Sequence, residues 1–354
     1  SRLISFIANF NILNRRMHNK SFTVDNQVTI VGGRNIADEY FQSGGESEFI
    51  DEDLLAIGPV VDDVSDGFDE YWNSAEAIPM SVFDAMVPHS SLRESAEEGR
   101  KYLERLRDNA FLQSVNSNLA EQFVDGQLPL LPAEAAVILD YPDKIRRLLP
   151  RSASITSTFL QQMAMAASKE LIVISPYFVP QQPGIEFFAE LVKKGVRVVI
   201  ISNSLASTNH VSVHAVYARY RKPLLKQGVE LYELRPHVRG GESTTKLTLH
   251  SKVATVDRNK VFVGSFNLDP RSLYLNTEMG MGVDCSELAG SMAESILDTL
   301  PDFAYKLQLS KKGRLEWLLQ ATSGDELITT EPRTTWWRRF KTKLLSFLPI
   351  EGQM

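Results

Sequence analysis

The sequence predicts an α/β protein built from two lobes, each a mixed β-sheet flanked by helices, related by a pseudo-twofold axis. Three observations support this: an ungapped internal repeat, an alternation of apolar strands with helices, and a length of 354 residues. At about 100–200 residues per domain, that length accommodates two domains or two lobes of one fold. Hydrophobic residues make up 43% of the chain, which is enough for a packed core and excludes wholesale disorder.

The internal repeat relates two segments at a constant offset of 232 residues. The segment that begins at His18 and ends at Asn35 recurs as the segment from His250 to Asn267. Both copies read H-x-K-x(4)-D, followed by an apolar run, a glycine and an asparagine. One such match could arise by chance, whereas two in register indicate a duplicated unit.

Strand geometry predicts what each copy presents. Residues i and i+2 of a strand share a face, so the His and Lys of each motif point the same way. Asp25 and Asp257 fall at the strand end, before turn-favouring residues and a second apolar run, which is typical of a hairpin. Two copies face to face would gather two imidazoles, two ammonium groups and two amides.

These groups suit chemistry at a phosphodiester. Lysines and amides can donate hydrogen bonds to the charged phosphoryl oxygens of the transition state. One imidazole can attack phosphorus and form a phosphohistidine, while the other protonates the leaving alcohol and then serves as a base. The chemistry requires no metal and no other cofactor. The single cysteine, Cys285, excludes an intrachain disulfide and a multi-cysteine metal cluster.

Between the motifs, apolar periodicity predicts helices at 155–167, 184–194 and 211–226 and strands at 171–174, 196–202 and 230–234. This alternation predicts a mixed sheet with helices on both faces. His214, Tyr217 and Arg221 fall at helical spacing on one face of the third helix, where packing is one role for them. Only 17 residues precede His18, so we expect the first lobe to be truncated at its N-terminus.

The paired motifs resemble those of the phospholipase D superfamily. The stretches SPYFVP at 175–180, GSFNLDPRS at 264–272 and GGRNIADEYF at 32–41 resemble its bacterial cardiolipin synthase branch, of the cardiolipin synthase C type. The resemblance extends over nearly the whole chain. It implies a phosphatidyltransferase that forms cardiolipin from phosphatidylglycerol and a second phospholipid, for which phosphatidylethanolamine is a candidate. It also implies a bacterial enzyme, peripheral to the inner membrane.

The resemblance assigns roles to the motif residues. It implies that His18 is the nucleophile and His250 the general acid and base. The phosphate-binding positions of the family match four residues of the repeat: Lys20, Lys252, Asn35 and Asn267. Asp25 and Asp257 complete the family signature, although their place at the strand end suggests that they fix the turns.

Two carboxylates are expected to orient the imidazoles. By the resemblance, Glu278 lies where family members place the carboxylate that orients the second-motif histidine. Its first-lobe counterpart is expected to open the strand at 54–57, where Asp53 fits best and Asp51 is the alternative. Such a carboxylate fixes the tautomer of an imidazole and raises its basicity. Gly33 stands where the second motif has Ser265, so the two half-sites are unequal.

The C-terminal segment predicts contact with a membrane surface. Residues 332–350 contain five basic residues and no acidic residue, and a helix there would gather aromatic residues on one side. Trp336 and Trp337 beside Arg338 and Arg339 are typical of a helix lying in the interface of an anionic bilayer. Docking of this helix on the protein's own core is the alternative. The net charge of −6 argues against a protein that coats nucleic acid.

The predicted organisation has four parts. An incomplete first lobe is expected over 1–72, a helical or irregular connecting segment over 73–150, the second lobe over 151–300 and a helical tail over 301–354. Within the family, a hydrolytic phospholipase D that uses water as acceptor is the alternative function. An inactive membrane-associated fragment is the rival from another class.

Overall fold

The computed structural model describes residues 14–41, 47–82, 89–106, 121–122, 125–146, 154–238, 245–320, 324–348 and 351–353. The strands are β1 Ser21–Val24, β2 Val28–Gly32, β3 Ser47–Ile50, β4 Asp53–Ile57, β5 Glu134–Leu139, β6 Glu170–Ile174, β7 Arg197–Asn203, β8 Glu230–Leu234, β9 Lys246–Leu249, β10 Val253–Val256, β11 Lys260–Gly264, β12 Met279–Asp284, β13 Ala304–Leu309, β14 Leu315–Leu319 and β15 Glu326–Ile328. The helices are α3 Val60–Trp72, α4 His89–Leu106, α7 Asp143–Arg146, α8 Ile155–Met165, α9 Gln181–Lys193, α10 Val211–Tyr217, α11 Arg221–Lys226, α12 Pro270–Tyr274, α13 Ser286–Phe303 and α14 Trp336–Leu345, with short 3-10 turns at Asp38–Tyr40, Met80–Val82 and Glu351–Gln353.

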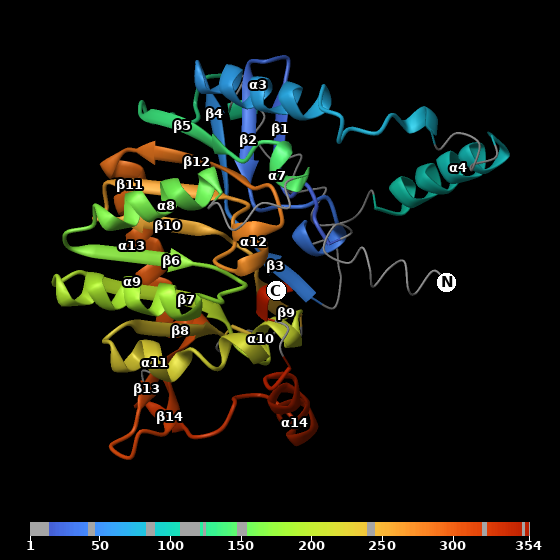
Figure 1. Ribbon diagram of the computed structural model, residues 1–354. Helices are drawn as coiled ribbons and strands as arrows, with labels where there is room; N and C mark the ends of the chain where they lie inside the picture. The colour runs from blue at the N-terminus through green and yellow to red at the C-terminus, as the bar shows by residue number, and fades with distance from the viewer. Residues whose placement is uncertain are drawn as a thin grey trace.

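The molecule is a mixed α/β structure, as predicted. A ten-stranded mixed sheet has the order β15-β14-β13-β8-β7-β6-β10-β11-β12-β5. A three-stranded antiparallel sheet, β1-β2-β4, lies near the top of Figure 1, and the pair β3-β9 joins segments from both halves of the chain. The lobes are therefore unequal in size among the described residues.

The alternation predicted ahead of the second motif is confirmed. Strands β6, β7 and β8 are parallel neighbours, with α8 and α9 in the positions expected for helices. The single helix predicted over 211–226 is instead two helices, α10 and α11. Pro223 explains the break, because it has no N–H to donate to the carbonyl of Arg219 and its ring crowds the preceding turn.

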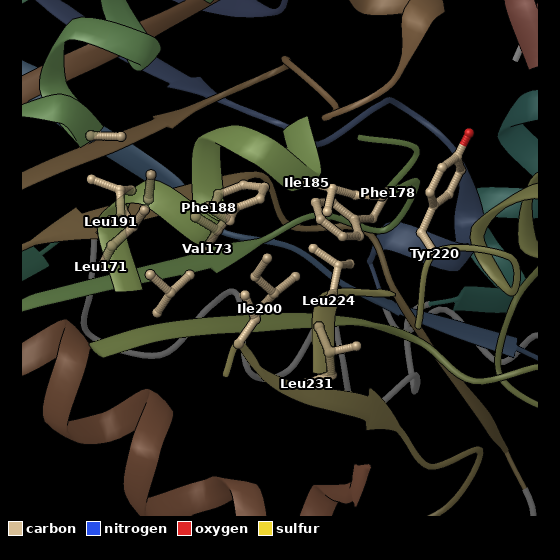
Figure 2. Packing of buried hydrophobic residues seen from close by; sticks show 14 of the residues in the cluster. Leu171, Val173, Phe178, Ile185, Phe188, Leu191, Ile200, Tyr220, Leu224 and Leu231 are labelled. Atoms are coloured by element: carbon tan, nitrogen blue, oxygen red, sulfur yellow. The ribbon is translucent and has the colours of Figure 1, made fainter. Parts of the chain in front are cut away.

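The core lies on both faces of the large sheet. Figure 2 shows side chains of β6, β7 and β8 packed beneath α9, among them Val173, Ile200 and Leu231 facing Ile185 and Phe188. The alternate residues of the same strands pack on the opposite face, against α13. Both faces are covered, which is why these strands read as continuous apolar runs.

Two segments that we predicted to be helical or irregular add strands to this sheet. Strand β5, inside the expected connecting segment, pairs with β12 along its whole length. Strands β13, β14 and β15 lie in the expected helical tail and extend the opposite edge. The tail prediction is therefore wrong for 304–328 and correct for α14. Strand β5 joins the sheet through β12 and strand β13 through β8, both distant in the sequence, so local periodicity does not reveal these additions to the sheet.

The two predicted hairpins are confirmed and have the same register. Ser21 pairs with Val31 in β1-β2, as Val253 pairs with Val263 in β10-β11. Both turns place two residues at positive φ, beginning with Asp25 and Asp257 at φ 50° and 51°.

The two hairpins differ in how they are covered. In the second hairpin, β6 pairs with β10, and Ala254 and Val256 are 8% and 3% exposed. At the equivalent positions of the first hairpin, Phe22 and Val24 are 63% and 46% exposed, and the described residues supply no strand beyond β1.

A buried ion-pair network decides the role of the helix face formed by His214, Tyr217 and Arg221. All three side chains are buried. Arg221 donates from Nη1 to Glu233 Oε1 at 3.1 Å and from Nη2 to Glu331 Oε1 at 2.6 Å. The face therefore packs inside the protein, and the network fastens α11 and β8 to the segment that leads into α14.

Candidate active site

The two lobes meet where the two motif histidines lie. Strand β3 of the first lobe pairs in parallel with β9, which ends one residue before His250. The amide of His250 donates to the carbonyl of Ile50 at 2.8 Å. On the other side, Met17 forms a parallel bridge with Thr277, and the amide of His18 donates to the Thr277 carbonyl at 3.0 Å. Each histidine is thus held by a strand of the opposite lobe, as a pseudo-twofold arrangement requires.

Each imidazole contacts a carboxylate of the opposite lobe. Nδ1 of His18 lies 2.7 Å from Glu278 Oε2, and Nδ1 of His250 lies 2.6 Å from Asp51 Oδ2. A neutral imidazole donates its Nδ1–H to such a carboxylate and keeps its Nε2 lone pair available for reaction. Burial lowers the pKa of His250 to about 4 and lowers that of His18, although the carboxylates oppose the shift.

These contacts correct two predictions. Glu278 orients His18, whereas we expected it to orient the histidine of its own motif. Asp51, our alternative, orients His250, while Asp53 accepts a hydrogen bond from Arg34 Nε at 2.6 Å. Strand register explains the second error. Asp53 pairs with Gly32 as Gly280 pairs with Gly264, so Asp51, two residues earlier, is the counterpart of Glu278.

Glu278 is held by hydroxyl groups in a fully buried position. Ser265 Oγ donates to Oε2 at 2.5 Å, and Ser272 Oγ donates to Oε1 at 2.7 Å. Burial opposes ionisation of Glu278, but His18 and the two hydroxyls lower its pKa below the usual value. The carboxylate is therefore charged and fixed in position behind His18.

The half-site around Asp51 is built differently. A Cβ atom on Gly33 would lie 2.4 Å from Asp51 Oδ1, so the carboxylate occupies the space that a side chain at position 33 would need. The backbone amide of Glu52 donates to the same oxygen at 3.0 Å. The first half-site thus combines a glycine, Gly33, with the shorter carboxylate Asp51. The second combines a hydroxyl donor, Ser265, with the longer carboxylate Glu278.

The two motif lysines have equivalent positions. Lys20 Nζ donates to the carbonyl of His18 at 2.8 Å, and Lys252 Nζ donates to the carbonyl of His250. Lys252 Nζ also lies 2.9 Å from Nδ1 of its histidine. Among the described residues, neither ammonium group forms an ion pair with a carboxylate. Burial lowers the pKa of Lys252 to about 7 and that of Lys20 to about 8.

Tyr40 is a site residue that our sequence analysis missed. Its hydroxyl lies 3.2 Å from Nε2 of His250 and accepts a hydrogen bond from Asn35 Nδ2 at 2.8 Å. Burial raises its pKa to about 12, so the phenol stays protonated. The other motif asparagine, Asn267, has its Oδ1 buried without a hydrogen-bond partner. Tyr40 lies within the stretch 32–41, but its place on a 3-10 turn gave no sign of a role.

Asp25 and Asp257 lie outside this site. Asp257 accepts hydrogen bonds from the backbone amides of Ser168, Lys169 and Glu170 at 2.7–2.9 Å, which outweigh burial and lower its pKa to about 2. Both aspartates occupy hairpin turns seven residues after the histidines, and a strand rises about 3.3 Å per residue. Both therefore lie at the turns, as their position in the sequence suggested, and Asp257 ties its turn to the backbone that leads into β6.

We expect sulfate to bind this site about tenfold more tightly at pH 6 than at pH 8.5. The lowered pKa values mean that Lys252 and Lys20 carry their charges below about pH 7 and 8 and lose them above. Sulfate keeps the same charge over this range, so a change in affinity reports the protein alone. Isothermal titration calorimetry measures it. The Lys252→Met variant should bind weakly at both pH values, and equal affinities in the unmodified chain would contradict the assignment.

Similarity to known proteins agrees with this geometry. A sequence model described as "Cardiolipin synthase, PLD-like domain" matches residues 160–298. Cardiolipin synthase C of Escherichia coli (strain K12) is 39% identical over 99% of this chain and 76% of its own length. A protein of Helicobacter pylori (strain ATCC 700392 / 26695) is 32% identical over 88% of this chain, which spans 59% of that relative.

The fold also matches a solved structure. The phosphatidylserine synthase of Haemophilus influenzae Rd KW20 superposes with a TM-score of 0.53 at 15% identity, covering 83% of this chain and 64% of that one. At this identity the match concerns the fold alone. The mixed α/β fold of this chain therefore has a counterpart in a solved structure.

Proposed function

Since this chain belongs to the phospholipase D superfamily, in its cardiolipin synthase branch, and is a phosphatidyltransferase, we propose that it forms cardiolipin from phosphatidylglycerol and a second phospholipid. One observation carries the proposal: two imidazoles, each held by a carboxylate of the opposite lobe, lie beside the half-buried Lys20 and the buried Lys252, neither of which has a carboxylate partner among the described residues. A phosphodiester supplies the negative charge that such a site lacks.

In the first step, Nε2 of His18 attacks phosphorus and the bond to the headgroup oxygen breaks. The leaving alcohol takes a proton from His250. Among the described residues Nε2 of His18 has no hydrogen-bond partner, whereas Nε2 of His250 contacts the Tyr40 hydroxyl. A free lone pair suits the nucleophile, and the bound phosphodiester anion favours the protonated form of the second imidazole.

In the second step, a headgroup hydroxyl of phosphatidylglycerol gives its proton to His250 and attacks the phosphohistidine. The phosphorus–nitrogen bond breaks, cardiolipin leaves, and His18 is free again. Lys20 and Lys252 neutralise charge on the phosphoryl oxygens in both steps. With phosphatidylglycerol as donor the other product is glycerol, and with phosphatidylethanolamine it is ethanolamine.

An apolar cavity supports a lipid substrate. A cavity of about 300 Å³ lies between α8, α9 and the sheet, and its lining includes Lys252 together with Phe187, Phe188 and Phe266. Space for hydrocarbon thus adjoins the phosphate-binding lysine. This favours a phospholipid over a nucleic acid as the phosphodiester, in agreement with the acidic net charge.

The test is mass spectrometry of lipids after incubation with phosphatidylglycerol vesicles, with and without phosphatidylethanolamine. We expect cardiolipin from the unmodified chain and none from the His18→Ala or His250→Ala variants. Phosphatidic acid as the main product would identify water as the acceptor and the chain as a hydrolytic phospholipase D. Correctly folded protein that yields neither lipid would favour an inactive membrane-associated protein.

We further propose that α14 holds the enzyme on an anionic bilayer of the bacterial inner membrane. In α14, Trp336 and Trp337 are 58% and 64% exposed, and Phe340 and Leu344 extend the same apolar face. Arg338 does not join this surface, since its Nη2 donates to the carbonyl of Thr208 at 3.2 Å. Arg339 likewise donates to the protein's own backbone. The helix therefore packs on α10 through one face and exposes the aromatic one.

No helix among the described residues is both long and apolar enough to cross a bilayer. Thr208 belongs to the loop that follows β7, at the strand ends that border the active site. The bond from Arg338 thus fastens α14 to this loop, and α14 lies beside α10 in Figure 1. We infer that lipid bound by the exposed face of α14 is held on the side of the protein to which this loop belongs.

Replacing Trp336 and Trp337 together by alanine is expected to lower binding to phosphatidylglycerol vesicles by at least about tenfold. Each indole loses apolar contact area worth on the order of 1–2 kcal/mol at a membrane interface. Flotation with vesicles measures the bound fraction. Trp72→Ala, which removes an exposed tryptophan of α3 in the first lobe, serves as the control and should float normally. Unchanged flotation of the double variant would contradict the proposal that α14 binds the membrane.

A further inference from the structure

Two arginines outside the duplicated motifs lie together at the edge of the site, one from each lobe. Arg16 precedes His18 by two residues, and its carbonyl accepts a hydrogen bond from the amide of Thr277 at 3.2 Å. Arg271 lies in α12, and its Nη2 donates to the carbonyl of Asn14 at 2.8 Å. The pairing that joins the lobes therefore brings the guanidinium group of Arg271 beside the segment from Asn14 to Arg16.

Neither guanidinium group is in contact with a counter-ion. Among the described residues, neither Arg16 nor Arg271 forms an ion pair with a carboxylate. Burial, and then the charge of Arg16, lower the pKa of Arg271, while the more distant charges of Asp269 and Glu278 oppose the shift. Burial, and then both arginines, lower the pKa of His210, whose ring packs edge-on against Tyr177. Arg16 is exposed and Arg271 half-buried, and neighbouring cations that repel one another are stabilised when an anion binds between them.

The cluster adjoins the reaction site without being part of it. Arg16 also acts on Lys20, whose pKa is lowered mainly by burial and in part by this neighbour. Tyr177 links the two regions, because its ring lies 5.3 Å from that of His210 and 6.4 Å from that of His250. The cationic cluster, formed by Arg16, Arg271 and His210, could therefore bind an anionic group next to the phosphate that the motif residues bind.

The repeated motifs account for one phosphate only. Two imidazoles, two lysines and two asparagines surround the phosphodiester that reacts. Transfer from one phospholipid to another involves a second phosphate, on the acceptor, which takes no part in bond breaking. That phosphate is separated from the attacking hydroxyl by a short glycerol headgroup, so it must lie close to the motif residues when the hydroxyl reaches phosphorus.

We propose that Arg16 and Arg271 bind the phosphate of the acceptor phospholipid and so hold its hydroxyl beside the phosphohistidine. Guanidinium groups bind phosphate through paired charge-assisted hydrogen bonds, which suits a subsite for orientation. The inference rests on the proposed function, because hydrolysis uses no second phosphate. It also gives a reason why transfer would be faster than hydrolysis, because an anionic lipid acceptor is held in place and water is not.

The experiment compares two acceptors for the same donor. Vesicles of phosphatidylethanolamine supply the phosphatidyl group, and the acceptor is either phosphatidylglycerol in the vesicle or free glycerol in the buffer. Only the first carries a phosphate. The Arg16→Gln/Arg271→Gln double variant is compared with the unmodified chain and with Arg258→Gln, which removes one exposed arginine at the far end of the sheet.

In the double variant we expect cardiolipin formation to fall by about tenfold or more. Transfer to free glycerol, which gives phosphatidylglycerol, should stay within about twofold of the unmodified chain. The Arg258→Gln control should be normal in both reactions. Equal losses with both acceptors would overturn the inference, because the arginines would then act on the donor or on the fold. No loss with either would overturn it as well.

Calorimetry with inorganic phosphate tests the subsite independently of any reaction. We expect the unmodified chain to bind two phosphate ions and the double variant to bind one. A single phosphate on both proteins would refute the second site. Two phosphates on a chain that makes no cardiolipin would refute the proposed function, and with it the lipid acceptor, while leaving the anion site.

Discussion

The His18→Ala variant is expected to lose at least about 10⁴-fold of the transfer rate and to form no covalent intermediate. The alanine removes the only group proposed to bond to phosphorus, so the two-step route is closed. Glu278 remains behind an empty position, and the lysines still bind the phosphodiester. Lipid binding should therefore persist while turnover disappears, and incubation with radiolabelled phosphatidylglycerol followed by denaturation measures the covalent label.

The His250→Ala variant should behave differently with an activated substrate. A phosphodiester with a nitrophenol leaving group needs no proton from an acid, so His18 should still attack it and release one equivalent of nitrophenol. Breakdown of the intermediate needs the missing base and should be slow, so labelled protein accumulates. A burst from His18→Ala and none from His250→Ala would reverse the two roles.

The two hairpins could be predicted because their information is local. A strand fixes which residues share a face, and the duplicated spacing placed each lysine beside its histidine. Helices α8 and α9 and strands β6 to β8 followed from apolar periodicity in the same way. Strands β5 and β13 could not, because their places in the sheet depend on pairing with β12 and β8, which lie far away in the sequence.

The site shows the same division between local and distant information. The family resemblance assigned Glu278 to His250, yet the lobes exchange carboxylates, and an exchange of this kind is visible only when the two halves are assembled. Choosing between Asp51 and Asp53, which lie two positions apart, required the register of β4 against β2. Tyr40 reaches Nε2 of His250 across the lobe interface, and no spacing rule connects residues 210 positions apart.

The exchange of carboxylates makes a prediction that a site within one lobe would not. Glu278→Gln should slow formation of the phosphoenzyme, because its imidazole partner is His18. Asp51→Asn should slow breakdown of the phosphoenzyme, because its partner is His250. An amide cannot stabilise the charged imidazole and can hold the wrong tautomer, a change that costs about 10²–10⁴ in rate. Rapid quenching with the nitrophenyl substrate separates the two steps.

Asp53→Asn is the matched control for Asp51→Asn, two residues away and with the same chemical change. It weakens a partly exposed ion pair with Arg34, which costs at most about 1 kcal/mol of folding free energy and should leave both steps within about threefold of normal. If Asp53→Asn and Asp51→Asn were equally impaired, the loss would reflect the fold of this loop rather than the imidazole. If Glu278→Gln slowed breakdown and left formation intact, each carboxylate would serve its own lobe. Only step-specific losses in the crossed pattern are consistent with two half-sites that complete one another, because each lobe then supplies the imidazole for one step and the carboxylate for the other.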